Sequence, residues 1–246
     1  MATAIHDGHF VSDAASAEMA IDETGRLREE DPFTGQALFD LPTYTIAHRS
    51  RFEIDLNRAR DNAIYHTPEQ SWGLKVWKSE PSEAVCRDTL AYHDAWYSHL
   101  EARLDELSTR HERFVLLDVH SYNHRRDGAD ASPTPQAEAP DINIGTFSMP
   151  REYWAFLLDP LMDAMRAFDF AGRTLDVRQN IAFEGKGEQT RFVHDRYPER
   201  GCAIALEFKK IYMDEWTGEP DEQSLRAMRG LLRHVADTAS EILEAA

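Results

Sequence analysis

The chain has 246 residues, 42% hydrophobic and 29% charged, and no apolar run approaches the ~20 residues needed to span a bilayer. Its formal net charge of −17 argues against a nucleic-acid partner, because a phosphate backbone must be neutralised by Lys and Arg. Two cysteines do not indicate a disulfide framework, and residues 1–10 do not resemble a signal peptide, so we expect a cytoplasmic protein. The length is suitable for one domain spanning residues 1–246.

Apolar runs and helical periodicity divide the chain into strands and helices. The predicted strands are residues 2–5, 51–56, 114–119 and 202–208. The predicted helices are residues 34–39, 82–110, 149–168 with a kink at Pro160, and a last helix from Asp221 onward. Residues 12–30 are polar and acidic, 61–82 are irregular, and 181–194 form a hairpin or loop. Strands that alternate with helices predict an α/β sandwich.

The most informative segment is residues 114–126, FVLLDVHSYNHRR. An apolar strand is followed directly by imidazoles and guanidinium groups, and open α/β sheets bind ligands beyond the carboxyl ends of their strands. We therefore expect His120 to be a metal ligand, although a strand followed by a polar loop would read the same way. Asp118 points to the same side of the strand, where it either orients a ligand imidazole or forms an ordinary buried salt bridge.

Three further strand-like runs end in groups suited to catalysis. His6 and His9 follow the first strand, Asn57 and Arg58 follow the second, and Glu207 lies near the end of the last. A histidine or an Asn-Arg pair in such a place is usually an ordinary surface feature. A carboxylate in an apolar strand needs a partner or a function, because burying its charge is costly.

The order of these groups along the chain resembles that of a known family. The matching pieces are IHDG at 5–8, EDPFTG at 30–35, SRFEIDLNR at 50–58, LDVHS at 117–121 and ALEFKKIYMDE at 205–215. They resemble the N-formylglutamate amidohydrolase family, within the zinc carboxypeptidase and aspartoacylase superfamily. In those two latter groups the first motif is His-x-x-Glu, and His9 stands where that glutamate would be. The resemblance implies a three-layer, zinc carboxypeptidase-like sandwich with a mixed sheet of about eight strands between helices.

The resemblance and the residue types together imply a catalytic metal, one Zn²⁺ per chain, although another divalent ion would be bound by the same donors. A catalytic zinc takes three protein ligands and leaves one position for water. His6 and His120 supply two of these ligands. The third is either His9 or an acid among residues 29–31, of which Asp31 is the first candidate.

The remaining site residues follow from the same reaction. Zinc lowers the pKa of its water and polarises the carbonyl, and Glu207 is expected to pass the water's proton to the leaving amine. Arg58 with Asn57 would bind a substrate α-carboxylate, since guanidinium and carboxylate pair bidentately. Arg125 or Arg126 would bind a second carboxylate, as a glutamate side chain requires. The expected substrate is a small anionic N-formyl or N-acyl amino acid.

Other interpretations stay open. The Pro- and Ala-rich residues 127–141 form a mobile loop, either a lid or a plain excursion. A catalytically idle relative that binds a carboxylate ligand or serves as a scaffold is the alternative function. A serine hydrolase using Ser121 lacks the G-x-S-x-G motif. The acyl group, the amino acid and the oligomeric state are left open.

Overall fold

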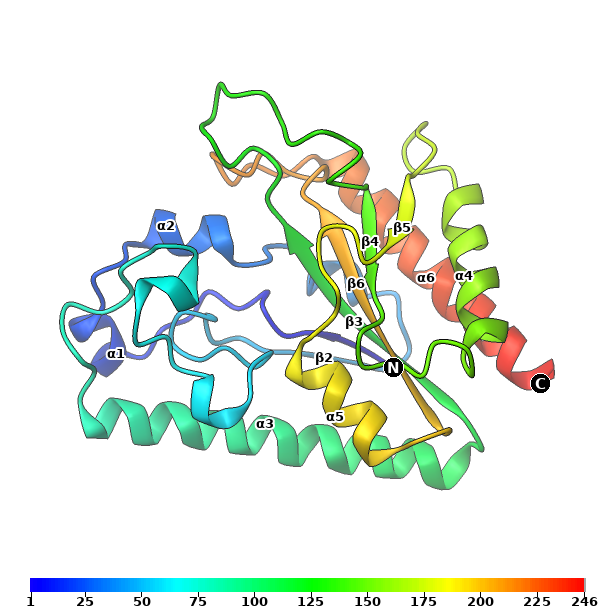
Figure 1. The fold of residues 1–246 in the computed structure, drawn as a ribbon, viewed down its shortest axis with the longest axis horizontal. Coiled ribbons are helices and arrows are strands. Elements are labelled where there is room, and N and C mark those ends of the chain that lie inside the picture. Colours follow the sequence, from blue (N-terminus) through cyan, green and yellow to red (C-terminus); the bar gives the residue numbers. More distant parts are fainter. Residues whose placement is uncertain (246) are drawn as a thin grey trace.

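A computed structural model describes residues 1–245 and contains one six-stranded sheet in the order β2-β1-β3-β6-β4-β5 (Figure 1). The strands are β1 (Ala2–Ala4), β2 (Tyr44–Ile46), β3 (Phe114–Tyr122), β4 (Ile142–Gly145), β5 (Val177–Gln179) and β6 (Gly201–Lys209). All neighbours are parallel except β4 and β6, which makes the sheet mixed. The α/β class and the mixed sheet are confirmed. The expectation of about eight strands was wrong for the residues described.

Helices cover both faces of this sheet. In Figure 1, α3 (Glu83–Arg110) and α5 (Glu188–Arg196) lie on one side, and α4 (Ala155–Ala167) and α6 (Glu222–Ala245) on the other. The shorter elements are α1 (Asp13–Glu18), α2 (Glu23–Glu29), η1 (Gln36–Leu38), η2 (Arg60–Asn62) and η3 (Pro68–Ser71). Within residues 1–245, no helix is long and apolar enough to cross a membrane.

The two longest strands, β3 and β6, are buried on both faces, which accounts for their continuous apolar runs. On β3, Leu117 and Val119 pack in the core beneath α4 and α6, whereas Leu116 packs toward α3 and α5. The predicted strands 114–119 and 202–208 are confirmed. Because β3 continues to Tyr122, His120 lies within the strand and its backbone is fixed by the sheet.

The predicted range and the predicted N-cap of the long helix are also confirmed. The side chain of Ser82 caps α3 by accepting a hydrogen bond from the backbone N–H of Val85. The last helix begins at Glu222, next to the predicted start, and the predicted helix at 34–39 is the 3₁₀ turn η1.

One local prediction was wrong and two were only partly right. Residues 51–56 form a buried turn and not a strand, because Phe52, Ile54 and Leu56 pack into a cluster outside the sheet and reproduce an alternating pattern. The second long helix begins at Ala155 and continues through Pro160. Residues 181–187 form a loop, as predicted, but residues 188–194 belong to α5 and are helical.

Two short helices lie in the acidic segment 12–30, where the sequence predicted neither a helix nor a strand. Helices α1 and α2 are only six and seven residues long and bury one side chain each, so neither shows a helical apolar stripe. Their only local signals are the caps Ser12 and Asp22, each of which accepts a backbone N–H of the first turn.

Residues 123–141 contain no helix or strand, in agreement with the predicted loop. Its second half is attached to the sheet: Lys209 Nζ donates to the carbonyl of Ala139 at 2.8 Å, and Arg178 donates to that of Ala137 at 3.0 Å. Mobility of the whole range stays a prediction.

A buried histidine attaches α5 to β6. His194 Nε2 accepts a hydrogen bond from the backbone N–H of Ala203 at 3.0 Å, and His194 Nδ1 lies 2.9 Å from Ser148 Oγ. Ala203 lies in the part of β6 that does not pair with β4. Since an amide N–H can only donate, this contact requires the neutral imidazole. Burial lowers the pKa of His194 to about 4.

We therefore expect acid to destabilise the fold through His194. Between pH 6.5 and 4 the unfolded chain binds this proton and the folded chain does not, so the free energy of unfolding falls as the pH falls, by up to about 3 kcal/mol. Urea denaturation across this range should show a shallower pH slope for His194→Gln than for the wild-type chain. Equal slopes would contradict the assignment.

Candidate metal centre

The carboxyl ends of β1, β3 and β6 meet at one edge of the sheet, because these strands are parallel. His6 lies two residues after β1, and His120 on β3 stands opposite Glu207 on β6. Asp31 follows α2, and its backbone N–H donates to the carbonyl of His6 at 2.9 Å. The topology thus gathers residues that are far apart in the chain.

Three ligand atoms face one point at this edge. His6 Nδ1 and His120 Nδ1 are 3.2 Å apart, and Asp31 Oδ2 lies 3.5 Å from the first and 3.3 Å from the second. All three side chains are buried. Among residues 1–245, this is the group of His, Cys, Asp and Glu side chains that could hold a metal ion.

The outward nitrogens of both histidines face carboxylates. His6 Nε2 lies 2.7 Å from Asp55 Oδ1, and His120 Nε2 lies 3.1 Å from Asp118 Oδ1, within ion-pair distance but outside hydrogen-bond alignment. A carboxylate in this place keeps the proton on Nε2 and directs the lone pair of Nδ1 inward. Three lone pairs that converge on one point need a cation between them, so the residues fit a metal ion.

The pKa values of Asp31 and His120 also indicate that the centre needs positive charge. Burial opposes the ionisation of Asp31, but His120 and His6 outweigh it and hold the pKa of Asp31 well below its usual range. Burial likewise opposes protonation of His120, but the Asp118 and Glu207 carboxylates hold its pKa well above the usual range. The centre is therefore rich in carboxylates and requires positive charge, from a proton or from a metal ion.

Glu207 is the carboxylate for which the sequence predicts a catalytic role, and it lines the cavity that His6, Asp31 and His120 also line. It is half-buried, and it has no hydrogen bond to another side chain or backbone group within residues 1–245. Burial raises the pKa of Glu207 to about 7. A free carboxylate with such a pKa can both accept and return a proton near neutral pH.

Two connected cavities border these residues. A small cavity of about 120 Å³, here called the chamber, is lined by His6, Asp31 and His120. A larger cavity of about 780 Å³, here called the cleft, lies on the side of Arg58 and residues 180–188. The chamber and the cleft share four lining residues, Arg51, Asn57, Phe183 and Glu207.

The Asp-x-Asn-Arg turn contributes to both the centre and the cleft. Asp55 Oδ2 lies 3.4 Å from Arg58 Nε and 3.1 Å from Arg51 Nη2. Arg58 also donates to the carbonyl of Gln70 at 2.9 Å and remains 36% exposed, so it can bind a ligand in the cleft. Arg51 lies over the ring of Trp72 and was missed by the sequence reasoning, although it stands four residues before Asp55.

Two predicted site residues are not brought to the centre. His9 Nδ1 pairs with Glu30, and its Nε2 lies 3.4 Å from Glu23. The chain turns away at Gly8, where a side chain would collide with the backbone of His48, so the third position goes to Asp31. The predicted metal role of His9 is therefore not supported by its place.

Arg125 is similarly displaced. Its guanidinium lies 2.7 Å from Asp214 Oδ2, and its backbone N–H donates to the buried Glu215. The next residue, Arg126, lines the chamber and lies 3.4 Å from Glu29. The sequence could not distinguish these adjacent arginines, because their loop has no periodicity to indicate which one points inward.

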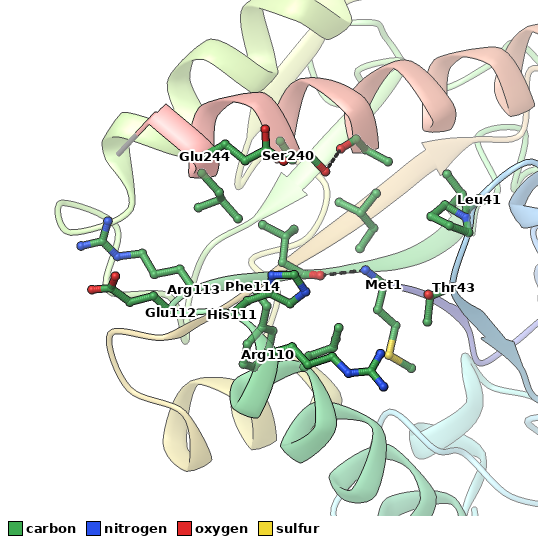
Figure 2. Close-up of a pocket in the computed structure, with 17 residues that line it drawn as sticks. Met1, Leu41, Thr43, Arg110, His111, Glu112, Arg113, Phe114, Ser240 and Glu244 are labelled. Carbon is green, nitrogen blue, oxygen red and sulfur yellow. Dashed lines mark hydrogen bonds between the residues drawn. The ribbon is translucent and has the colours of Figure 1, made fainter.

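A further cavity of about 490 Å³ lies at the opposite edge of the sheet, where β1 and β3 begin (Figure 2). Figure 2 shows the amino group of Met1 beside β3, and this group donates to the carbonyl of Val115 at 3.1 Å. Arg110, His111 and Arg113 line this cavity. It is separate from the group of ligand atoms and takes no part in the centre.

One buried amide holds the carboxylate behind His120. Gln189, on α5, is fully buried; its Nε2 donates to Asp118 Oδ1 at 2.6 Å and to Thr3 Oγ1 at 2.7 Å. Its Oε1 accepts the indole N–H of Trp96 at 3.2 Å. Gln189 therefore fixes the orientation of Asp118. No sequence signal marked it, since a glutamine on a short helix has no characteristic pattern.

Fold and centre together define an α/β protein with a buried histidine pair and an aspartate at the carboxyl edge of a mixed sheet. The profile of the N-formylglutamate amidohydrolase family matches residues 1–213. The chain belongs to this family.

Solved structures share the fold. An N-formylglutamate amidohydrolase from Ralstonia eutropha JMP134 is 18% identical, with a TM-score of 0.76 over 100% of this chain and 94% of that one. A gene product of Agrobacterium tumefaciens is 16% identical, with a TM-score of 0.66 over 99% and 91%. Likeness at such low identity shows the fold alone. No match is found among curated proteins.

We expect Gln189→Met to weaken Zn²⁺ binding by about 10- to 100-fold, because Asp118 would lose the donor that orients it behind His120. Competition with a chromophoric chelator measures this affinity. Trp96→Phe is the matched control: it removes the hydrogen bond that Gln189 accepts and leaves the two that Gln189 donates, to Asp118 and Thr3. Equal affinities for Gln189→Met and the control, with similar thermal stability of the metal-free forms, would refute this role.

Proposed function

We propose that this protein is a zinc-dependent amidohydrolase that cleaves the amide bond of N-formyl or other N-acyl amino acids. The observation that carries the proposal is the convergence of His6 Nδ1, His120 Nδ1 and Asp31 Oδ2 within 3.5 Å, in a chamber that Glu207 also lines. Membership of the family supports the same class of reaction. The proposal includes a zinc carboxypeptidase-like fold and action as a single domain in the cytoplasm.

The donor set is appropriate for a catalytic zinc. His6, His120 and Asp31 would hold the ion through two nitrogens and one oxygen, a set that leaves a position open for water. Zinc bound there would lower the pKa of a water molecule and polarise the amide carbonyl. Asp55 and Asp118 keep the two imidazoles in the tautomer that presents Nδ1 inward.

Glu207 moves the proton. Its carboxylate accepts a proton as water attacks the carbonyl carbon, and it returns that proton to the nitrogen as the C–N bond breaks. One water molecule is consumed, and the products are a carboxylate and a free amine. The raised pKa of Glu207, about 7, allows the same group to perform both transfers.

Arg58 and Asn57 are proposed to bind the α-carboxylate of the substrate. Both line the cleft, and the guanidinium of Arg58 retains free donors there after its contacts with Asp55 and Gln70. The predicted role of Arg125 is not carried forward, because its guanidinium is held by Asp214 outside both cavities.

Metal removal tests the reaction class. We expect the purified protein to bind about one Zn²⁺ per chain and to release formate from N-formyl amino acids. Chelation should abolish formate release, and added Zn²⁺ should restore it. Turnover that survives complete chelation would overturn the zinc proposal. A protein that binds Zn²⁺ but cleaves none of a panel of N-acyl amino acids would instead be the idle, carboxylate-binding relative.

Substitution of the base tests the mechanism. We expect Glu207→Gln to lower kcat by about 10²- to 10⁴-fold while metal content stays the same, because the amide cannot accept the proton. In the wild-type enzyme kcat/KM should fall as the pH drops below about 7, since Glu207 works in its ionised form. Glu188→Gln is the control, because it also removes a carboxylate that lines the cleft, and that carboxylate is paired with Arg191 outside the cleft. Unchanged turnover in Glu207→Gln would rule out this role.

A further inference from the structure

The cleft beside the metal centre is much larger than the chamber that contains it, about 780 Å³ against 120 Å³. Glu207 lines both, so an amide bond placed at Glu207 would extend one half of its molecule into each. The volume of the cleft falls within the range of ~300–1,000 Å³ that is typical of pockets for drug-sized ligands. A glutamate, with ten non-hydrogen atoms, would leave most of it empty.

One side of the cleft is formed by residues 180–187, here called the cleft wall. One buried side chain binds three consecutive residues of this wall, and backbone hydrogen bonds to residues 144 and 147 hold it on either side of them. Asn143 Oδ1 accepts the backbone N–H groups of Ile181 and Ala182 at 2.8 and 3.0 Å, and its Nδ2 donates to the carbonyl of Phe183 at 2.8 Å. Asn143 is fully buried on β4. The cleft wall is thus attached to the sheet at three consecutive residues.

This wall presents apolar side chains to the cleft. Ile181 is 44% exposed and Phe183 is 39% exposed, and both line the cleft. The ring of Phe183 stands edge-on to Tyr122, with centroids 5.5 Å apart, which fixes its orientation. Apolar side chains that are held rigidly and left exposed in a pocket are typical of a binding surface for an apolar group.

The charges of the cleft leave room for one carboxylate. The cations that line it, within residues 1–245, are Arg51, Arg58 and Lys186. Arg51 and Arg58 share one carboxylate, that of Asp55, and Lys186 is paired with Glu184. One positive charge therefore remains uncompensated among these pairs, which matches an α-carboxylate and leaves no partner in the cleft for a second one.

We propose that the cleft selects N-acyl amino acids with a large apolar side chain, which Ile181 and Phe183 contact while Arg58 binds the α-carboxylate. This proposal rests on the proposed function and specifies its substrate. An acidic side chain such as that of glutamate would lie against the apolar wall without a counter-charge. The acyl group would occupy the smaller chamber.

The test compares kcat/KM of the zinc-loaded enzyme for the N-formyl derivatives of phenylalanine, leucine, glycine and glutamate. We expect the phenylalanine and leucine derivatives to be preferred at least about 10-fold over the other two, in keeping with the selectivity that apolar pockets achieve. Phe183→Ala should lower kcat/KM for N-formylphenylalanine at least about 10-fold more than for N-formylglycine. Phe183→Leu should restore part of this preference.

Phe39→Ala is the matched control, because Phe39 is an exposed phenylalanine that lines neither cavity. A preference for N-formylglutamate, or an equal effect of Phe183→Ala on all four substrates, would overturn this inference and leave the proposed function intact. Hydrolysis of none of the four, nor of the N-acetyl derivatives of the same amino acids, by zinc-loaded protein would overturn both.

Discussion

The structure depends on one electrostatic constraint: the carboxylates of Asp31, Asp55 and Asp118 are buried around two imidazoles at the edge of a sheet. Buried carboxylates are unfavourable unless positive charge and hydrogen-bond donors surround them. The parallel pairing of β1 with β3 places His6 and His120 where they supply part of that charge. A cation between their Nδ1 atoms would complete it, and the same arrangement that is costly without a cation would then be a stable metal site.

Each carboxylate is itself held by a different part of the chain, which explains why so many elements converge on one edge. Asp55 accepts from the backbone N–H of Asn57 at 2.8 Å and pairs with Arg51 at 3.1 Å. Asp118 accepts from Gln189 on α5, and through that glutamine it is connected to Trp96 on α3. The helices on this face of the sheet therefore do more than cover the core, because their polar residues set the orientation of the imidazoles.

The sequence predicted the parts of the fold and site that depend on local pattern. Strands 114–119 and 202–208 could be read because both faces of each are buried, which gives continuous apolar runs. His6, His120 and Glu207 were predicted as site residues because parallel strands carry ligands at their carboxyl ends, and the structure brings the three residues together. Only the tertiary structure distinguishes Asp31 from His9 as the third candidate ligand. The chain turns away from the centre at Gly8, where it approaches His48 closely, and no local sequence pattern encodes this approach. Residues 51–56 were wrongly predicted to form a strand, because a turn that is buried against its own cluster shows the same alternation of apolar and polar residues as a strand.

The residues proposed for the reaction and the residues proposed for substrate specificity lie on different parts of the backbone. His120 and Glu207 lie within paired strands, where neighbours on both sides fix the backbone and the register keeps the two residues opposite each other. Ile181 and Phe183 lie outside the strands, on a segment that is attached through the side chain of Asn143 and through backbone hydrogen bonds at Asn180 and Glu184. Side chains on this segment can therefore be exchanged without disturbing the sheet, because the groups that hold it are backbone N–H and carbonyl groups common to every residue except proline. In the proposed enzyme, a metal centre fixed by the sheet would stand beside a wall whose side chains lie outside the sheet, and changes in those side chains would direct one hydrolytic reaction to different amino acids.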